Sequence, residues 1–430
     1  MNIAQICHDN FGGAGNAARR LHEGLLGLGQ RSSLLVMVRQ GADPATYVIP
    51  PRDGFPLSPA AGLGGHPDFA ASVKRWGRRV GRYGNRPKGL ELFTDAGAVS
   101  RFWDMDQVRE ADAVILHWIC GVIDVAGEAL AALKGKAVVW VLHDMNPFTG
   151  GCHYAMGCDR YAQACGVCPQ LGSRRSEDLS RRVFEDKLRA YADLDFTVVT
   201  PSRWLAGKAG AGSLMRGRTI EVVPNSVPTD IFRPMDRAAS RAKLGIPPSA
   251  SVILFGAESL GNRRKGVGHL LAALDILAAR KPDRDIALLT FGGGTLPEGL
   301  PFPAYHAGIV RDESELAAVY AAADVLALPS LADNLPNVAL EAMACGLPTV
   351  CFAIGGLPEI VDSGKTGLLA PPGDDAGFAE ALARVLADGR GPYSRCREEA
   401  LERYSLNVQA SRFVSLLERI VPQEAPCSNP

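Results

Sequence analysis

Residues 333–348 read DNLPNVALEAMACGLP, and the apolar run Thr349–Phe352 follows them directly. Pro336 suits the first turn of a helix, the alanines after it favour helix, and Gly346 ends the pattern. We therefore predict a short helix that leads into a strand. The strand is apolar without alternation, which is typical of a parallel strand covered on both faces.

Glu341 is the only charged residue between Asp333 and Glu359, and it falls inside this predicted helix. A buried carboxylate without partners costs several kcal/mol. We therefore expect Glu341 to be satisfied either by protein donors or by the hydroxyls of a bound ligand.

The same alternation of apolar runs and helical stretches extends outward in both directions, which predicts an α/β fold built twice. The predicted strands cover residues 3–6, 33–37, 113–117, 137–142 and 196–200 in the first half, and residues 252–255, 286–291, 324–328 and 349–352 in the second. Between the two sets lies the Pro-containing segment 222–234. We place the domain boundary between about Pro201 and Pro234.

The chain has 430 residues, 46 Lys plus Arg against 46 Asp plus Glu, and a hydrophobic fraction of 47%. This length favours two large domains, and the balanced charge gives no indication of nucleic-acid binding. The first residues lack a basic leader before an apolar core, and no stretch reaches the ~20 apolar residues of a membrane span. We expect a cytoplasmic protein that is not an integral membrane protein.

The segment from Lys74 to Lys88 carries seven basic residues and no acidic ones. Their spacing with Trp76 and Tyr83 is compatible with a basic amphipathic helix that contacts an anionic membrane surface. A solvated loop or helical face is the alternative. The end of the chain, residues 421–430, is predicted to be disordered.

Doubly wound domains bind ligands where strands end and helices begin. In the first half, the Gly-rich turn at Gly12 and Gly13 follows the first strand, and backbone N–H groups there could approach phosphate or sugar. His143 follows the strand 137–142, and His117 occupies the equivalent end of the strand before it. The turn lacks the full dinucleotide fingerprint, which argues against a Rossmann oxidoreductase.

In the second half, the consecutive cations Arg263, Arg264 and Lys265 lie in a Gly-bounded loop after the first strand. Arg forks and a Lys point charge suit a diphosphate, although a charge run on its own is more often a solvated face. The glycines at 292–294 and 355–356 follow later strands and leave room for a ligand to approach the backbone. These loops together predict a binding site for an anion or a polyol.

Cys152, Cys158, Cys165 and Cys168 form a cluster after the His143 loop. The last two have the Cys-x-x-Cys spacing of a zinc knuckle, but the first two are spaced more widely. Structural zinc, a disulfide pair and free thiols all remain open from the sequence.

The order of these motifs resembles a family-4 retaining glycosyltransferase of the GT-B fold, from Ile3 to about Ile420. The matching pieces are Gly12-Gly13, His143, the segments 224–234 and 264–266, the segments 323–330 and 333–348, and the Gly-rich segments 355–359 and 364–369. The resemblance implies two Rossmann-like doubly wound domains with the active site in the cleft between them. The implied domains are 1–200 for the acceptor and 201–404 for the nucleotide sugar, with a helix at about 405–420 packing back on the first.

The resemblance also implies roles for particular residues. Glu341 corresponds to the Glu that hydrogen-bonds the ribose hydroxyls of the donor. Asp333 stands where the family has a Glu beside the donor sugar, and its side chain is shorter by one methylene, on the order of 1 Å. Ala257 stands at the position of the usual phosphate-binding Arg, so we expect Arg264, or failing that Arg263, to compensate beside Lys265.

The implied catalytic residues are His143, Arg264, Lys265, Asp333 and Glu341. The implied donor-binding residues are Gly12, Gly13, Gly256, Arg263, Gly293, Ser330, Asn334 and Leu335.

The implied reaction moves a sugar, with retention, from a nucleotide diphospho-sugar to a glycan or polyprenyl-diphosphate-linked acceptor, without an essential metal or other cofactor. Synthesis of a surface or extracellular polysaccharide is the expected setting. The alternatives are a non-catalytic nucleotide- or carbohydrate-binding relative, and a GT-B sugar-nucleotide epimerase or phosphorylase.

Overall fold

The computed structural model describes residues 1–50, 86, 90–95, 97, 100–125 and 129–422. The basic segment from Lys74 to Lys88 lies outside the described residues except for Arg86, whose Nε donates to the carbonyl of Gln170 at 2.6 Å. The predicted disordered tail likewise lies outside them beyond Pro422.

The chain forms two compact units. The first comprises Met1–Pro201, Leu205–Val223 and Gln409–Pro430, and the second comprises Ser202–Trp204 and Pro224–Val408. The change of unit between Val223 and Pro224 lies inside the predicted boundary region of residues 201–234. The implied division at residue 200 differs from it, because residues 205–223 supply most of a helix and the last strand of the first sheet.

The first unit contains a seven-stranded sheet in the order β3-β2-β1-β4-β5-β6-β7, and every pairing in it is parallel. Its strands are β1 (Asn2–Asp9), β2 (Arg31–Val38), β3 (Thr46–Val48), β4 (Ala113–Leu116), β5 (Ala137–Val141), β6 (Thr197–Thr200) and β7 (Ile220–Val222). The central strands β4 and β5 are buried along their whole length, as a sheet covered on both faces requires.

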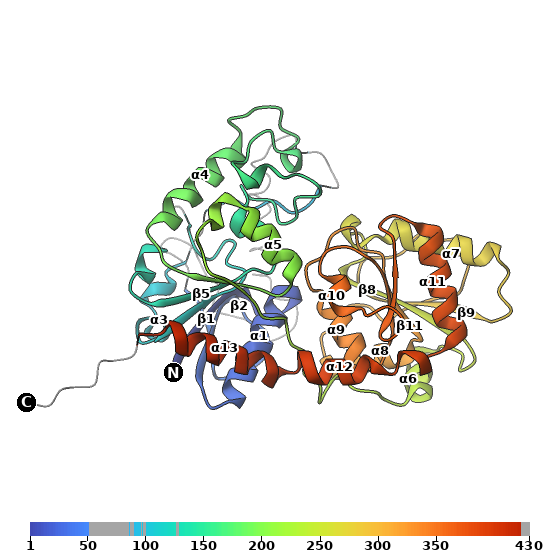
Figure 1. The fold of residues 1–430 in the computed structure, drawn as a ribbon. Coiled ribbons are helices and arrows are strands. Elements are labelled where there is room, and N and C mark those ends of the chain that lie inside the picture. The colour runs from blue at the N-terminus through green and yellow to red at the C-terminus, as the bar shows by residue number, and fades with distance from the viewer. Residues whose placement is uncertain (51–85, 87–89, 96, 98–99, 126–128, 423–430) are drawn as a thin grey trace, which may run out of the picture. The chain divides into compact units, whose positions relative to one another are not determined.

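The helices of the first unit are α1 (Gly12–Gly27), α3 (Asp106–Arg109), α4 (Leu179–Ala192), α5 (Arg203–Ala211) and most of α13 (Leu406–Ile420). Figure 1 shows α13 running across the first sheet. Phe413 and Leu417 of α13 are fully buried in one core with Ile3 and Leu25. The last helix of the chain therefore completes the core built by the first strand.

The second unit contains a six-stranded parallel sheet in the order β10-β9-β8-β11-β12-β13. Its strands are β8 (Ser251–Ser259), β9 (Ile286–Gly293), β10 (Ala304–His306), β11 (Val325–Leu328), β12 (Thr349–Phe352) and β13 (Gly367–Ala370). Its helices are α6 (Arg237–Leu244), α7 (Val267–Ala279), α8 (Glu313–Ala322), α9 (Asn337–Ala344), α10 (Leu357–Ile360), α11 (Asp375–Asp388) and α12 (Arg395–Tyr404).

The connections also contain short 3-10 helices. They are η2 (Phe102–Asp104), η3 (Ala131–Leu133), η4 (Asn146–Phe148), η5 (Arg160–Ala162), η6 (Pro169–Leu171), η7 (Ser213–Met215), η8 (Arg263–Lys265) and η9 (Gly391–Tyr393).

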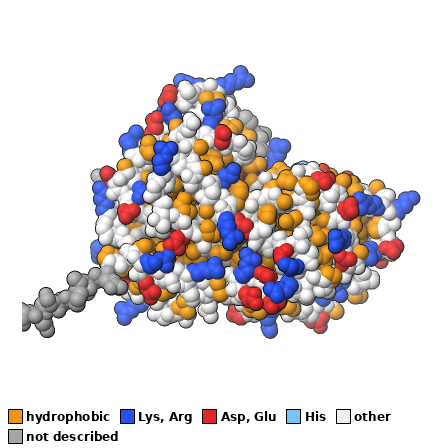
Figure 2. All heavy atoms as spheres, viewed as in Figure 1, with side chains coloured by type: hydrophobic (Ala, Val, Ile, Leu, Met, Phe, Trp, Pro, Cys, Tyr) orange, Lys and Arg blue, Asp and Glu red, His pale blue; other side chains and the backbone are white. Residues whose placement is uncertain are grey.

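Two parallel sheets with helical crossovers confirm the predicted α/β, doubly wound class. On the face shown in Figure 2, basic and acidic side chains are interspersed, in keeping with the equal numbers of the two kinds in the sequence. Within the part of the chain that the structure describes, no helix has the length and apolarity needed to cross a bilayer.

Candidate functional site

The loop after β8 holds three consecutive cations in η8. The side chain of Asn262 accepts a hydrogen bond from the backbone N–H of Arg264 at 3.0 Å and so caps the turn. Gly266 ends the turn with φ +76°, and a Cβ at this position would lie 1.8 Å from the carbonyl oxygen of Pro329. Only glycine satisfies both conditions, so the loop is held against the end of β11.

Asp333 lies in the next loop, after β11, and brings two of these cations together. Its Oδ2 lies 2.7 Å from Nζ of Lys265, and its Oδ1 lies 3.6 Å from Nη1 of Arg264. The hydroxyl of Ser330 lies 3.3 Å from Oδ2, and Arg264 also donates to the carbonyl of Ala332 at 2.6 Å. Arg263 is exposed, whereas Arg264 is the arginine that contacts Asp333 beside Lys265.

The electrostatics of the cluster keep Asp333 ionised. Its burial would by itself raise the pKa of the carboxyl, but the charges of Lys265 and Arg264 and the hydrogen bond from Lys265 outweigh burial and hold the pKa below its ordinary value. Two cations against one carboxylate leave an excess positive charge, and such a cluster can bind an anion.

Glu341 lies on α9 and is 3% exposed, as predicted. Its Oε2 accepts a hydrogen bond of 2.7 Å from the hydroxyl of Tyr320, which lies on α8. The Tyr320 ring makes edge contacts with Phe232 and Phe291, which fix the position of the hydroxyl. A protein donor is therefore one partner of Glu341. The sequence analysis missed Tyr320, because nothing in its local pattern separates it from an ordinary core tyrosine.

The segment that follows Asp333 is held by close backbone packing. A Cβ on Gly355 would lie 1.8 Å from the carbonyl oxygen of Asp333, and a Cβ on Gly356 would lie 2.0 Å from that of Asn334. The hydroxyl of Ser202 donates to Oδ1 of Asn334 at 2.6 Å. The predicted Gly pair thus positions the loop around the candidate site.

Leu335 is buried in the core, and its carbonyl accepts a bond of 3.4 Å from Nδ2 of Asn225. Its side chain packs in the core of the second unit, and its role in donor binding stays a prediction. Asn225 also lies 3.4 Å from Oδ1 of Asn337, so it links the connecting segment to the start of α9.

Gly256 has a packing role that the sequence did not indicate. A Cβ on this residue would lie 2.0 Å from the ring of Phe291, so glycine at this position makes room for that ring. The neighbouring Gly292 has φ +116°, and a Cβ added to it would lie 1.7 Å from the carbonyl oxygen of Ala257. A Cβ added to Gly293 would lie 3.2 Å from the carbonyl oxygen of Glu258. The absolute need for glycine lies at Gly292, one position before the predicted Gly293.

In the first unit, Gly12 and Gly13 form the first turn of α1. Gly12 has φ +67°, which glycine adopts without strain. A Cβ on Gly13 would meet no atom within 4 Å, whereas one on Gly15 would lie 2.4 Å from Oδ1 of Asp9. Gly13 therefore faces open space, as the predicted phosphate or sugar contact requires, and Gly15 is fixed by packing.

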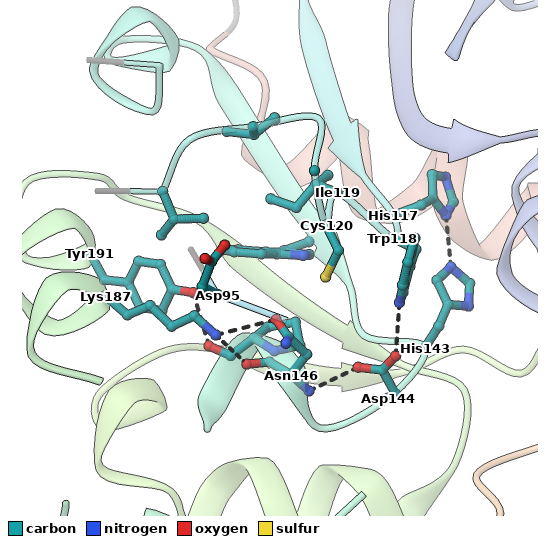
Figure 3. A pocket seen from close by; sticks show the side chains of 15 residues that line it. Asp95, His117, Trp118, Ile119, Cys120, His143, Asp144, Asn146, Lys187 and Tyr191 are labelled. Carbon is teal, nitrogen blue, oxygen red and sulfur yellow. Dashed lines mark hydrogen bonds between the residues drawn. The ribbon is translucent and has the colours of Figure 1, made fainter. Parts of the chain in front are cut away.

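His143 follows β5 and lies beside His117, which follows β4. The two rings stack with centroids 5.3 Å apart, and Nε2 of His143 lies 3.0 Å from Nδ1 of His117 (Figure 3). Burial lowers the pKa of His143 to about 4, against the opposing charge of Asp144. Burial and the neighbouring His143 hold the pKa of His117 well below its ordinary value. Both imidazoles are therefore neutral at physiological pH.

Asp144, the next residue, organises the loop around η4. Its carboxylate accepts hydrogen bonds from Nε1 of Trp118 at 3.0 Å and from the backbone N–H of Asn146 at 2.8 Å, as Figure 3 shows. It also lies 2.6 Å from Nδ1 of His153. Lys187 reaches the same loop from α4 and donates to the carbonyl of Asn146 and, at 3.0 Å, to that of Thr149. These contacts fix the conformation of the loop that follows His143.

The four clustered cysteines line one pocket of the first unit. Burial raises the pKa of Cys152 to about 12 and that of Cys165 to about 11, so these thiols are protonated. Both ring nitrogens of His153 are engaged, with Asp144 and with the hydroxyl of Thr94 at 2.8 Å.

No group of three or more His, Cys, Asp or Glu side chains within the described ranges is arranged to hold a metal ion. Structural zinc stays a prediction from the sequence. Metal analysis of untagged protein tests this prediction. Protein that contains no more than a trace of zinc would contradict it.

Part of the second unit matches a known family model. Residues 250–388, which contain the cation loop, Asp333 and Glu341, match the family model described as Glycosyl transferases group 1. The predicted resemblance to these glycosyltransferases is thereby confirmed.

Curated relatives that match part of the chain are named glycosyltransferases. A D-inositol 3-phosphate glycosyltransferase of Corynebacterium jeikeium is 40% identical over 185 residues, which cover 39% of this chain and 44% of the relative. One from Corynebacterium urealyticum is 33% identical over 269 residues, covering 58% and 62%. The matches span about half the length of such relatives.

Solved structures show the same fold over nearly the whole chain. A sucrose-phosphate synthase of Thermosynechococcus elongatus aligns over 97% of this chain and 98% of its own, with a TM-score of 0.63 and 20% identity. The HepE protein of Anabaena in complex with UDP-glucose aligns over 97% and 99%, with a TM-score of 0.59 and 16% identity. The predicted GT-B fold is confirmed.

Proposed function

We propose that this protein is a retaining glycosyltransferase that binds a nucleotide diphospho-sugar on its second unit. The observation that carries this proposal is the cluster of Lys265, Arg264 and Asp333, which lies at the carboxyl ends of two neighbouring strands within the family match. Departure of a nucleoside diphosphate develops negative charge, and fixed cations stabilise that charge most when they need not reorganise. Asp333 holds both cations in place, which supplies that preorganisation.

The proposed acceptor is a glycan or a polyprenyl-diphosphate-linked glycan, used in the cytoplasm for a surface or extracellular polysaccharide. The curated relatives are named for D-inositol 3-phosphate, which makes this phosphorylated polyol the second acceptor to test. Neutral His143 beside the Asp144 loop would contact the sugar.

A membrane-linked acceptor would agree with the basic segment between Lys74 and Lys88. We expect the protein to co-sediment with anionic vesicles at low salt, and to lose this binding when the basic residues are replaced by Gln. Binding that survives those replacements would rule out the segment as the membrane contact.

The donor proposal is tested by thermal shift with UDP-, GDP-, ADP- and dTDP-sugars. One donor should raise the unfolding temperature, because a ligand that binds only the folded state stabilises it by mass action. Lys265→Met should abolish the shift. Lys243→Met removes an exposed cation on α6 of the same unit and should retain it. Equal shifts in both variants would show that the cluster does not bind the donor.

Turnover separates an enzyme from a binding protein of the same fold. The wild type should transfer the sugar or slowly hydrolyse the donor, and Glu341→Ala should reduce this. Donor binding without any turnover in the wild type would instead favour the non-catalytic alternative. Conversion of the donor to an epimer would favour the epimerase.

A further inference from the structure

A continuous chain of hydrogen bonds crosses the first unit from a half-exposed carboxylate to His143. Its links join Asp43 Oδ2 to His22 Nε2 at 3.2 Å, His22 Nδ1 to Ser32 Oγ at 2.8 Å, Ser32 Oγ to Gln5 Nε2 at 2.9 Å, Gln5 Oε1 to His117 Nε2 at 2.9 Å, and His117 Nδ1 to His143 Nε2 at 3.0 Å.

The inner members of this chain are closed to solvent. His22 on α1, Ser32 on β2, Gln5 on β1 and His117 after β4 are each 3% exposed or less. Polar groups buried this deeply depend on one another for hydrogen bonds, because water cannot replace a missing partner. A change in the donor or acceptor role of one member therefore changes the role required of the next member.

The carboxylate end of the chain sets the direction of the first two bonds. Asp43 can only accept, so His22 must carry its proton on Nε2. Burial lowers the pKa of His22 despite the charge of Asp43, so the ring is neutral and its Nδ1 is an acceptor. The hydroxyl of Ser32 must then donate to His22.

The same logic continues to the other end. The oxygen of Ser32 accepts from the amide N–H of Gln5, which turns the amide oxygen of Gln5 towards His117. His117 donates to that oxygen through Nε2 and keeps an unprotonated Nδ1. His143 must donate to this nitrogen, so its proton lies on Nε2 and its Nδ1 is an acceptor.

Without Asp43, the chain would have no preferred direction. A flip of the Gln5 amide would reverse every donor and acceptor along it, and each neutral member could serve either arrangement. The carboxylate is the one member that cannot donate. Thr46 and the backbone N–H of Ala45 also donate to it, the latter at 3.1 Å, which holds it in place.

We propose that Asp43 acts through His22, Ser32, Gln5 and His117 as a set of positioning residues that hold His143 in its neutral Nε2–H tautomer. Any hydroxyl that meets Nδ1 of His143 must then donate to it. This consequence for a sugar hydroxyl rests on the proposed function, whereas the tautomer itself does not. Among the described residues, His117 lies within hydrogen-bond distance of His143, and the charge of Asp144 acts on it.

The tautomer is measured by long-range ¹H–¹⁵N correlation spectra of the full chain labelled on histidine. His143 is assigned by the signals lost in His143→Asn. In the wild type we expect a protonated-type shift at Nε2 and an unprotonated-type shift at Nδ1. In Asp43→Asn the Nδ1–H form should appear at His143, although the two residues are not in contact.

Two control variants keep the test decisive. Asp43→Glu keeps the charge and should restore the wild-type tautomer. Asp193→Asn, whose side chain is 77% exposed on another part of the same unit, should change nothing. Unchanged His143 signals in Asp43→Asn would overturn the proposal, and so would an Nδ1–H tautomer in the wild type.

A second measurement uses the enzyme once its donor is known. Asp43→Asn should lower kcat/KM for transfer roughly 2- to 10-fold, the effect of about one net hydrogen bond, and Asp43→Glu should recover it. An altered tautomer without any change in the transfer rate would support the chain of positioning residues but would refute the proposed role of His143 in transfer. No transfer by any variant, with the tautomer shift intact, would count against the proposed function alone.

Discussion

At the scale of single residues, the donor-side cluster depends on Asp333. This side chain is 7% exposed, and its charge is balanced by the cations of Lys265 and Arg264. The family resemblance implies a Glu here beside the sugar. The shorter Asp instead reaches the cations, which gives it a role in positioning them.

Asp333→Asn should lower the free energy of unfolding by about 3 kcal/mol near neutral pH, because it leaves two partly buried cations without their counter-charge. The folded-state pKa lies below the ordinary 3.8. The stabilisation is therefore fully present above the ordinary pKa and is lost as the pH falls through the folded-state value.

Urea denaturation of the wild type and the variant, at about pH 7 and again below that value, measures this difference. The difference in the free energy of unfolding between the wild type and the variant should become smaller in acid. Asp283→Asn, at a side chain that is 97% exposed, is the control and should give no gap at either pH. A gap for Asp333→Asn that does not change with pH would contradict an ionised Asp333.

At the scale of elements, glycines divide into those that serve packing and those that face open space. Gly256→Ala should destabilise the second unit by about 1–3 kcal/mol, because its Cβ would lie 2.0 Å from the Phe291 ring. Adding Phe291→Leu should recover part of the loss. Gly13→Ala meets nothing within 4 Å and should be neutral or slightly stabilising in thermal denaturation. Equal losses for Gly256→Ala and Gly13→Ala would contradict this division.

The helix α13 supplies core residues to the first unit from the far end of the chain. Phe413→Ala should lower the free energy of unfolding by about 3–5 kcal/mol, since Phe413 is fully buried against the first sheet. Arg412→Ala replaces an exposed neighbour and should change the free energy of unfolding little. Circular dichroism during urea denaturation compares the two variants, and a small effect of Phe413→Ala would show that α13 is not part of that core.

At the scale of the whole molecule, two units with separate sheets should respond differently to a donor. Hydrogen exchange with and without the donor identified by thermal shift should show new protection in the loops 256–266 and 329–341 of the second unit. The chain from Asp43 to Ser32 in the first unit should stay unchanged, because its bonds are already formed within the buried core. Protection confined to the first unit would contradict donor binding at the cation cluster.

The sequence alone predicted the two α/β sets, the positions of Lys265, Arg264 and Glu341 after buried strands, and the glycosyltransferase resemblance. These features are encoded locally, since strands, turns and loop residues repeat at short spacings. Only the tertiary structure decided which side chains meet: Tyr320 with Glu341, Asp333 with both cations, and Gln5 with His117, a pair separated by 112 residues. The physical reason is that a hydrogen bond between distant strands is set by the packing of whole elements, and a local pattern of residues carries no record of that partner.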